Sequence, residues 1–557
     1  MQYLFYILIM VLVVHVWSLL NERALLKRLR QRLKEDWTSQ PEEEYTSEKL
    51  ESLKEFYLSV RDERLDVDDI TWNDLDMNEI FMQMNNTQSA IGEEYLYAML
   101  RKPCFSKDEL SERNRLMEFF HEDEENRLKL QLRLHQIGKL KSISVYEYIN
   151  RLQDEKPAGN LPHYLMALGL ILSLISVFIH PGIGVVCTFF FIGHNIFRYY
   201  SRKAKIDKFL LVLSYLLRLL SNVDGIMKLD IPELKTYMDT LKQDASVFRK
   251  FQRGAGILVA KNTAGNILDA VVDYFRMLFH ADLIKYNKML RFFQKNRDVL
   301  NRIYRTIGFI DSCMAASSFR DRLPFYSIPA LVNSKVPMLS VSDLYHPLLM
   351  EPIPNSITEN RSVLITGSNA SGKSTFIKTL AINAILSQTI DTSISSSYKG
   401  SYFTICSSMA LRDSIFKNES YYIVEIKSLK RILDRINKEI PTLVLIDEVL
   451  RGTNTLERIA ASSRILVSLA KKNTLCFAAT HDIELTYILE NYYSNYHFQE
   501  QIVNNQIIFD YKLYQGRAVS KNAIKLLSLL GYTQEIIDNA EKAAKDFQNE
   551  GEWKKIP

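Results

Sequence analysis

The segment from Gly367 to Thr375 reads G-S-N-A-S-G-K-S-T, and these residue types at this spacing suit the binding of a nucleoside triphosphate. The two glycines allow the backbone to curl so that successive N–H groups point at phosphate oxygens. The Lys373 ammonium group would reach the β- and γ-phosphates, and the Ser374 hydroxyl would bind Mg²⁺. We expect the whole loop to line the nucleotide site: Gly367, Ser368, Asn369, Ala370, Ser371, Gly372, Lys373, Ser374 and Thr375.

The segments on either side of this loop supply the context that the motif requires. The apolar run S-V-L-I-T at 362–366 predicts a strand, and residues 376–387, rich in Ile and Leu, predict a helix. The positive end of that helix would face the same phosphates. A purely structural turn is the alternative, and the complete motif between a strand and a helix disfavours it.

Two adjacent carboxylates follow a second predicted strand. The apolar run T-L-V-L-I at 442–446 is typical of a buried parallel strand, and Asp447 and Glu448 come directly after it. Ligands of open α/β sheets bind at the carboxyl ends of such strands. We therefore expect Asp447 to hold Mg²⁺ through water, and Glu448 to orient or deprotonate an attacking water molecule.

A histidine ends a third predicted strand. The run T-L-C-F-A-A-T at 474–480 is followed by His481, whose position at a strand end favours a role as sensor of the γ-phosphate over a structural role. Ser420 precedes another apolar run, and the residues alone allow it to be only a helix or strand cap.

Composition sets broad bounds on the chain. It has 557 residues, of which 47% are hydrophobic, so three or four structural units with sizeable cores are expected. The net charge of +5 permits nucleic acid or anionic lipid as a partner without requiring either. The five cysteines form no C-x-x-C pair, which argues against a disulfide framework or a zinc site and fits a reducing cytoplasm.

Three apolar segments predict membrane-spanning helices. Residues 1–20 carry no charge over a length that crosses a bilayer, and an uncleaved anchor fits better than a signal peptide because no basic residue precedes the run. Residues 163–179 and 183–199 are two further apolar runs, separated by the turn signal Pro181-Gly182. A re-entrant hairpin or a buried helical pair is the alternative for these two.

Basic residues on the flanks of these segments predict the orientation, because Lys and Arg mark the cytoplasmic side of a membrane. An N-terminus outside the cell membrane leaves residues 21–160 and 201–557 in the cytoplasm, where ATP is found. The basic residues that follow the first span are Arg23, Lys27, Arg28, Arg30, Arg32 and Lys34, and those that follow the hairpin are Arg198, Arg202, Lys203 and Lys205.

Taken together, these motifs resemble the ATPase domain of the MutS family. T-G-S-N-A-S-G-K-S-T resembles its phosphate loop, including the asparagine at 369. L-V-L-I-D-E-V-L-R-G-T-N-T resembles the signature around its magnesium site, and A-A-T-H-D-I-E-L at 478–485 resembles its switch-histidine segment. E-S-Y-Y-I-V-E resembles the segment whose serine contacts the γ-phosphate bound in the opposite subunit, which implies that Ser420 acts in trans.

The resemblance implies a fold class and an organisation. It implies an α/β P-loop ATPase domain of the ABC type after an all-α helical core, with ATP and Mg²⁺ as cofactors and a homodimer that binds double-stranded DNA. The weaker similarity upstream includes 86–103 and 307–320. The predicted parts are a transmembrane anchor at 1–20, a charged juxtamembrane helix or linker at 21–68, a helical core at 69–345 interrupted by a hairpin at 163–200, and an ATPase domain with dimerisation helices at 346–557.

The chain also departs from the family pattern. The first 68 residues hold an anchor and a charged helix, without room for a mismatch-binding domain or its F-x-E segment. Mismatch recognition is therefore not expected, whereas ATP-driven DNA binding is. The alternatives are a membrane ATPase that acts on a protein or lipid, and an ABC-type transporter. The transporter is disfavoured because no L-S-G-G-Q precedes Asp447.

The predicted topology can be tested with reporter fusions to the full chain. A reporter at the C-terminus should be cytoplasmic, because the ATPase domain must meet ATP, and a reporter inserted at Gly182 should lie on the other side of the membrane. Protease accessibility in sealed vesicles distinguishes the two sides. A cytoplasmic signal from the Gly182 reporter would exclude the spanning hairpin.

Overall fold

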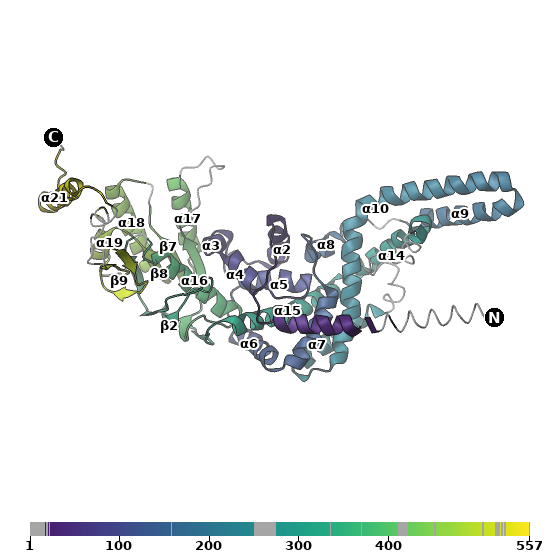
Figure 1. Cartoon of the computed structure of the whole chain (residues 1–557), viewed down its shortest axis with the longest axis horizontal. Helices are drawn as coiled ribbons and strands as arrows, with labels where there is room; N and C mark the ends of the chain where they lie inside the picture. The colour runs from purple at the N-terminus through teal and green to yellow at the C-terminus, as the bar shows by residue number, and fades with distance from the viewer. Residues whose placement is uncertain are drawn as a thin grey trace. The chain divides into compact units, whose positions relative to one another are not determined.

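The computed structural model contains two compact units (Figure 1). The first comprises Met1–Arg61, Phe81–Met99 and Glu112–Arg322, and the second comprises Asp62–Ile80, Leu100–Ser111 and Leu323–Pro557. The residues that the structure describes are 17, 20–21, 23–156, 159–249, 274–334, 336–368, 370–409, 421–450, 453–503, 506–518, 524, 527 and 531–555.

The first unit is helical throughout its described part, as the sequence predicts. Side-chain caps begin several helices: Thr46 accepts from the Lys49 N–H before α2, and Ser144 accepts from the Glu147 N–H before α8. The helices that lie wholly or partly in this unit are α2 (Ser47–Val60), α4 (Met77–Met84), α5 (Ala90–Arg101), α6 (Lys107–Glu122), α7 (Glu124–Ile137), α8 (Val145–Arg151), α9 (Leu161–Ile179), α10 (Pro181–Ile226), α11 (Lys235–Ser246), α14 (Ala281–Lys295) and α15 (Arg297–Arg322), with short 3₁₀ turns at Met227–Leu229 and Pro232–Leu234.

Two glycines allow α5 and α15 to approach each other closely. A Cβ atom at Gly92 would lie 2.1 Å from Oδ2 of Asp311, so only glycine fits there. The buried Asp311 carboxylate accepts hydrogen bonds from the backbone N–H and the hydroxyl of Ser89. Burial nevertheless raises the pKa of Asp311 to about 6 and the pKa of the neighbouring Glu94 to about 7.

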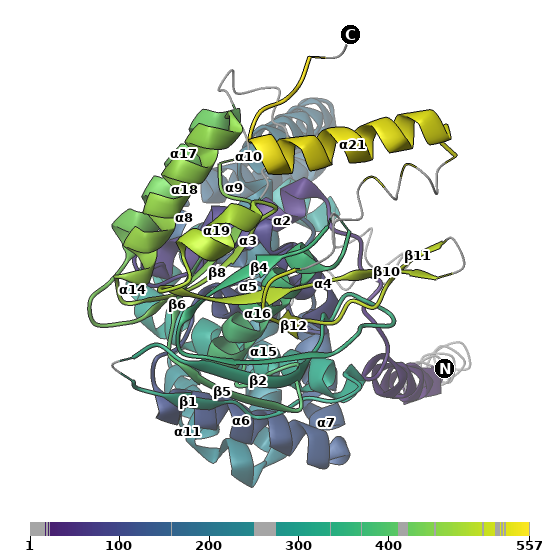
Figure 2. The same cartoon turned by 90° about the vertical axis from the view of Figure 1, so that its left-hand side faces the viewer.

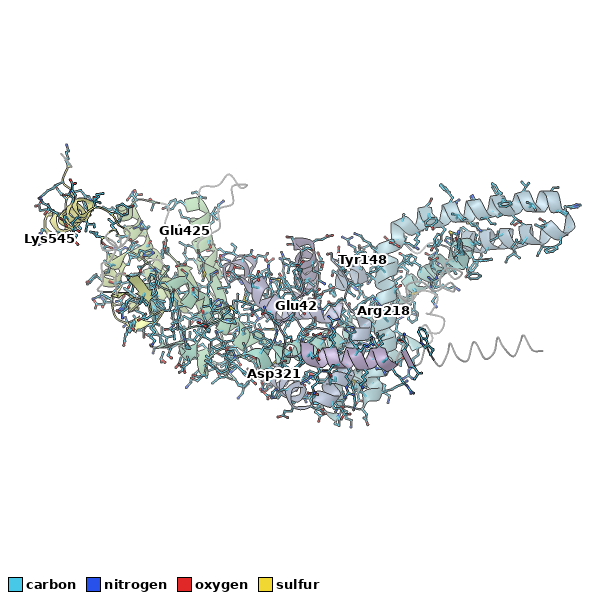
Figure 3. The ribbon with its side chains drawn as sticks, viewed as in Figure 1. Glu42, Tyr148, Arg218, Asp321, Glu425 and Lys545 are labelled. Atoms are coloured by element: carbon cyan, nitrogen blue, oxygen red, sulfur yellow. The ribbon has the colours of Figure 1, made fainter. Side chains whose placement is uncertain are left out.

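A hairpin of α9 and the first half of α10 extends from the other helices of the first unit (Figure 1). The turn falls at His180, between the end of α9 and the start of α10, where the Pro-Gly signal predicts it. The apolar side chains of this hairpin point outward (Figure 3): Phe178 is 90% exposed, Phe189 71% and Phe197 70%. Water does not favour such a surface, so another apolar phase or partner is expected to cover it.

The membrane prediction is supported only in part. Among the described residues, two helical stretches are long and apolar enough to cross a membrane, Leu161–Ile179 and Ile206–Leu229, rather than three. The first matches the first arm of the predicted hairpin. The second was not predicted, and because 56% of its window is buried it has the character of a core helix. Most of the predicted anchor at 1–20 lies outside the described residues.

The second unit contains two larger sheets and a two-stranded ribbon. The six-stranded sheet has the order β12-β9-β4-β8-β7-β6, with β12 antiparallel to its neighbour and the other pairs parallel. The four-stranded sheet has the order β1-β5-β2-β3. The strands are β1 (Ala330–Val332), β2 (Leu339–Leu344), β3 (Asn355–Glu359), β4 (Ser362–Thr366), β5 (Ser397–Ser401), β6 (Thr404–Ser408), β7 (Thr442–Asp447), β8 (Thr474–Ala479), β9 (Tyr493–His497), β10 (Glu500–Val503), β11 (Gln506–Phe509) and β12 (Tyr514–Gln515).

Helices cover both faces of the six-stranded sheet (Figure 2). α16 lies on the face toward the four-stranded sheet, whereas α17, α18 and α19 lie on the opposite face. This arrangement buries β4, β7 and β8 on both sides, which explains why their sequences are continuously apolar. The helices of this unit are α3 (Asp69–Asp74), α16 (Lys373–Thr389), α17 (Tyr421–Arg435), α18 (Thr455–Ala470), α19 (Ile483–Ile488) and α21 (Gln534–Glu550).

The predicted elements around the nucleotide motif are confirmed. The expected strand at 362–366 is β4, and the expected strands at 442–446 and 474–480 are β7 and β8, each within one residue at its end. The expected helix at 376–387 lies within α16. The structure therefore shows a helical N-terminal region followed by an α/β domain with mixed sheets.

Candidate functional site

The loop between β4 and α16 has the tight backbone that its glycines predict. Gly367 has φ 148° and Gly372 has φ 108°, and Ala370 also adopts a positive φ of 62°. A Cβ atom at Gly367 would lie 2.7 Å from the carbonyl oxygen of Phe498, so a larger residue does not fit there. The loop is thus held between the end of β4 and the segment after β9.

Lys373 folds back over this loop. Its Nζ atom donates hydrogen bonds to the carbonyl oxygens of Gly367 and Ser368, each 2.7 Å away, and the residue is only 5% exposed. The Ser371 hydroxyl is buried without a hydrogen-bond partner among the described residues. Ser374 and Thr375, in the first turn of α16, are exposed. A cation and backbone donors are therefore concentrated where an anion could bind.

Register brings the predicted carboxylates to the same edge of the sheet. In the parallel pairing, Ala479 lies beside Asp447 on one side and beside Ile365 on the other. Asp447 is 9% exposed, and its Oδ1 atom is buried without a hydrogen-bond partner among the described residues. A buried carboxylate oxygen that accepts no hydrogen bond from the protein is suited to bind a cation or water.

Glu448 and His481 meet at this edge. The Glu448 backbone has φ 56°, and its N–H donates to the Ala479 carbonyl oxygen over 3.0 Å. Nε2 of His481 lies 2.9 Å from Oε1 of Glu448. The structure therefore joins two residues that the sequence analysis assigned separately, and it places them after neighbouring strands.

A cavity of about 540 Å³ opens beside the loop. One wall contains the loop, the start of α16 and Glu448, whereas the other is apolar and aromatic. That second wall comprises Leu344, Tyr345, His346, Leu349, Pro352, Ile353, Phe498 and Tyr511. A phosphate-binding loop and aromatic side chains that line the same cavity have the chemistry required for the two ends of a nucleotide.

The aromatic wall of the cavity was not predicted from the sequence. Tyr345, His346, Phe498 and Tyr511 are far apart along the chain, and no local pattern shows that they share a cavity. Burial and the nearby Lys378 charge lower the pKa of His346 to about 4. His346 is therefore neutral near pH 7, and a neutral ring is suited to contact a base.

An acidic segment from the N-terminal half of the chain packs on the elements that carry the site. Asp76 pairs with Lys378 of α16 over 2.6 Å. Asp74 accepts hydrogen bonds from the Ser407 hydroxyl and the Met409 N–H, at the end of β6. Asp68 pairs with Arg431 and Arg435 of α17. Sequence reasoning missed these contacts, because no local pattern links residues so far apart in the chain.

The residues present fit a magnesium ion that is only partly held by protein. Among the described residues, no group of three or more His, Cys, Asp or Glu side chains could hold a metal ion. Mg²⁺ commonly keeps several waters and takes only one or two protein ligands beside phosphate oxygens. The unpartnered Asp447 oxygen and the exposed Ser374 hydroxyl match that requirement.

Two predicted site residues lie outside the described residues. These are Asn369 and Ser420. α17 begins at Tyr421, directly after Ser420, so this helix carries the segment to which the trans role was assigned.

The part of the chain that carries this site is similar to known proteins. Residues 363–548 match the family described as MutS domain V. The DNA mismatch repair protein MSH3 of Candida albicans is 25% identical over 321 residues, which cover 51% of this chain and 30% of that protein. MutS protein homolog 4 of Mus musculus is 30% identical over 267 residues, covering 44% of this chain and 27% of that protein.

A bacterial relative gives a similar result. The DNA mismatch repair protein MutS of Clostridium botulinum is 27% identical over 286 residues, covering 48% of this chain and 30% of that protein. The matched region thus spans less than a third of the length of these curated relatives. The matches show that part of this chain is similar to the MutS family.

The ion pairs of Asp68 with Arg431 and Arg435 are predicted to stabilise the second unit. Asp68→Ala should lower the free energy of unfolding of the second unit by about 3 kcal/mol, because it leaves two largely buried guanidinium groups without their carboxylate. Asp434→Ala on the same helix is the control, since its pair with Lys430 is exposed and its loss should cost less than about 1 kcal/mol. Chemical unfolding of the purified full chain measures both. Equal effects of the two variants would contradict the prediction.

Proposed function

We propose that this chain is a membrane-anchored, MutS-like ATPase that binds and hydrolyses ATP with Mg²⁺ at a dimer interface and couples this cycle to binding of double-stranded DNA. The observation that carries the proposal is the convergence of the 367–375 loop, Asp447, Glu448 and His481 at one edge of one sheet. The match to MutS domain V and the curated names of the relatives support the coupling to DNA.

Each residue has a defined part in the proposed reaction. The loop N–H groups and the Lys373 ammonium group bind the β- and γ-phosphates, which requires Lys373 to exchange its two loop carbonyls for phosphate oxygens. Ser374 and Asp447 would hold Mg²⁺, which when bound would supply positive charge beside the phosphates. The aromatic wall receives the base.

Glu448 and His481 act on the water and the γ-phosphate. Glu448 borders the cavity beside the loop, so its carboxylate orients the attacking water or accepts its proton. His481, held against Glu448, senses whether the γ-phosphate is present. Ser420, which precedes α17, completes the site of the opposite subunit, and the helices near the C-terminus join the two copies.

Membrane attachment is the second part of the proposal. The exposed apolar surface of the α9–α10 hairpin favours insertion into lipid, and the anchor at 1–20 would tether the chain at a second point. The site is then cytoplasmic, and the N-terminus is outside. The same surface favours an alternative function, an ATPase that acts on a membrane protein or lipid without binding DNA.

Two substitutions test the ATPase assignment. Lys373→Ala should abolish ATP binding, because it removes the cation at the phosphates, whereas Glu448→Ala should bind ATP and fail to turn it over. Binding of a fluorescent ATP analogue and release of phosphate by the detergent-solubilised full chain separate the two steps. Hydrolysis by Glu448→Ala at the wild-type rate would remove Glu448 from the mechanism.

DNA coupling is tested by the ATPase rate in the presence of duplex, mismatched and branched DNA. Contacts to phosphates should give binding or stimulation at low salt that weakens steeply as salt rises, with little preference for mismatches. Intact ATPase activity without any response to DNA at low salt would favour the alternative function.

A further inference from the structure

The turn that follows β7 is held in an unfavourable backbone conformation. Glu448 and Leu450 both adopt left-handed φ angles, 56° and 61°, although neither is glycine. Such residues keep this conformation only where surrounding contacts fix it. Leu450 is 1% exposed and Val449 is 4% exposed, so the turn is also buried. The direction of the Glu448 carboxylate therefore depends on whatever holds this turn.

Hydrogen bonds from β8, α18 and α17 hold this turn. The Ala479 carbonyl oxygen at the end of β8 accepts the Glu448 N–H over 3.0 Å, and the Ser462 hydroxyl of α18 donates to the Val449 carbonyl oxygen over 3.2 Å. From α17, Oε1 of Glu425 accepts the Leu450 N–H. Glu425 is the acidic side chain in this set.

Glu425 itself lies away from the reacting groups. It is 6% exposed and is absent from the lining of the cavity beside the loop. A carboxylate is rarely buried this fully unless it is paired or has a task. Its hydrogen bond from the Leu450 N–H connects it to the backbone of the turn.

α17 is anchored at its other end. Arg431 and Arg435 pair with Asp68, which fixes the C-terminal half of the helix, while Glu425 lies in its second turn. A shift of the N-terminal end of α17 would therefore act on the Leu450 N–H. α17 therefore links its first residues, from Tyr421, to the turn that carries Glu448.

We propose that Glu425 is a positioning residue for hydrolysis. By holding the Leu450 N–H it fixes the turn that aims the Glu448 carboxylate, and the position of α17 thereby sets the rate of the chemical step without changing nucleotide affinity. This inference rests on the proposed ATPase function.

The test compares three substitutions of Glu425 in the detergent-solubilised full chain. Glu425→Ala removes the acceptor and Glu425→Asp withdraws it by one methylene, so each should lower kcat for ATP by about tenfold or more. Glu425→Gln keeps an acceptor oxygen at the same reach and should retain kcat within about threefold. KM for ATP and the affinity for ADP should change by less than about twofold in all of them.

Ser428→Ala is the matched control. Ser428 lies one turn further along α17, is 4% exposed, and its hydroxyl has no hydrogen-bond partner among the described residues. This variant should hydrolyse ATP at the wild-type rate. Thermal unfolding of every variant reports whether the fold is retained, and Glu425→Asp keeps the test open if Glu425→Ala does not fold.

The outcomes separate the inference from the function on which it rests. A wild-type chain without ATPase activity would overturn the proposed function itself. An active wild-type chain together with wild-type kcat in folded Glu425→Ala or Glu425→Asp would overturn only the role of Glu425. Parallel losses of kcat, nucleotide affinity and thermal stability, without recovery in Glu425→Gln, would show a merely structural residue and also overturn it.

Discussion

The parallel register of β4, β8 and β7 places the residues of the proposed ATP site at one edge of the sheet. Because Ile365, Ala479 and Asp447 lie side by side in neighbouring strands, the three chain segments that follow these strands leave the sheet at the same edge. Those segments are the glycine-containing loop, the His481 segment and the Glu448 turn. A slip of one residue in either pairing would move each side chain to the other face of the sheet.

Contacts from outside the sheet hold the helices and the turn at this edge in place. Segment 62–80 reaches α16, β6 and α17 through three aspartates, so the phosphate-loop helix and the helix after 420 share one acidic support. Glu425 and Ser462 then connect α17 and α18 to the Glu448 turn. A hydrolysis site of this kind depends on contacts from several elements, and a small movement of any of them can alter the chemistry.

Much of the site could be predicted from sequence, because its motifs are local. Continuous apolar runs of strand length identify β4, β7 and β8, and polar residues directly after them identify the edge. The aromatic wall of the cavity, the aspartates at 68, 74 and 76, and the Glu425–Leu450 hydrogen bond could not be predicted in this way. They arise from packing between segments up to several hundred residues apart. Hydropathy likewise could not show that residues 206–229 pack within the helical unit.

The central claim, that one sheet edge forms a single ATP site, is tested most directly by hydrogen exchange of the detergent-solubilised full chain with and without Mg²⁺ and a non-hydrolysable ATP analogue. The account predicts slower exchange on binding at two separated stretches, 367–376 and 448–450, because the phosphates would lie on the loop, and the magnesium ion held by Asp447 and the water oriented by Glu448 would lie beside the turn. Binding of the analogue with protection at the loop and no change at 448–450 would contradict it.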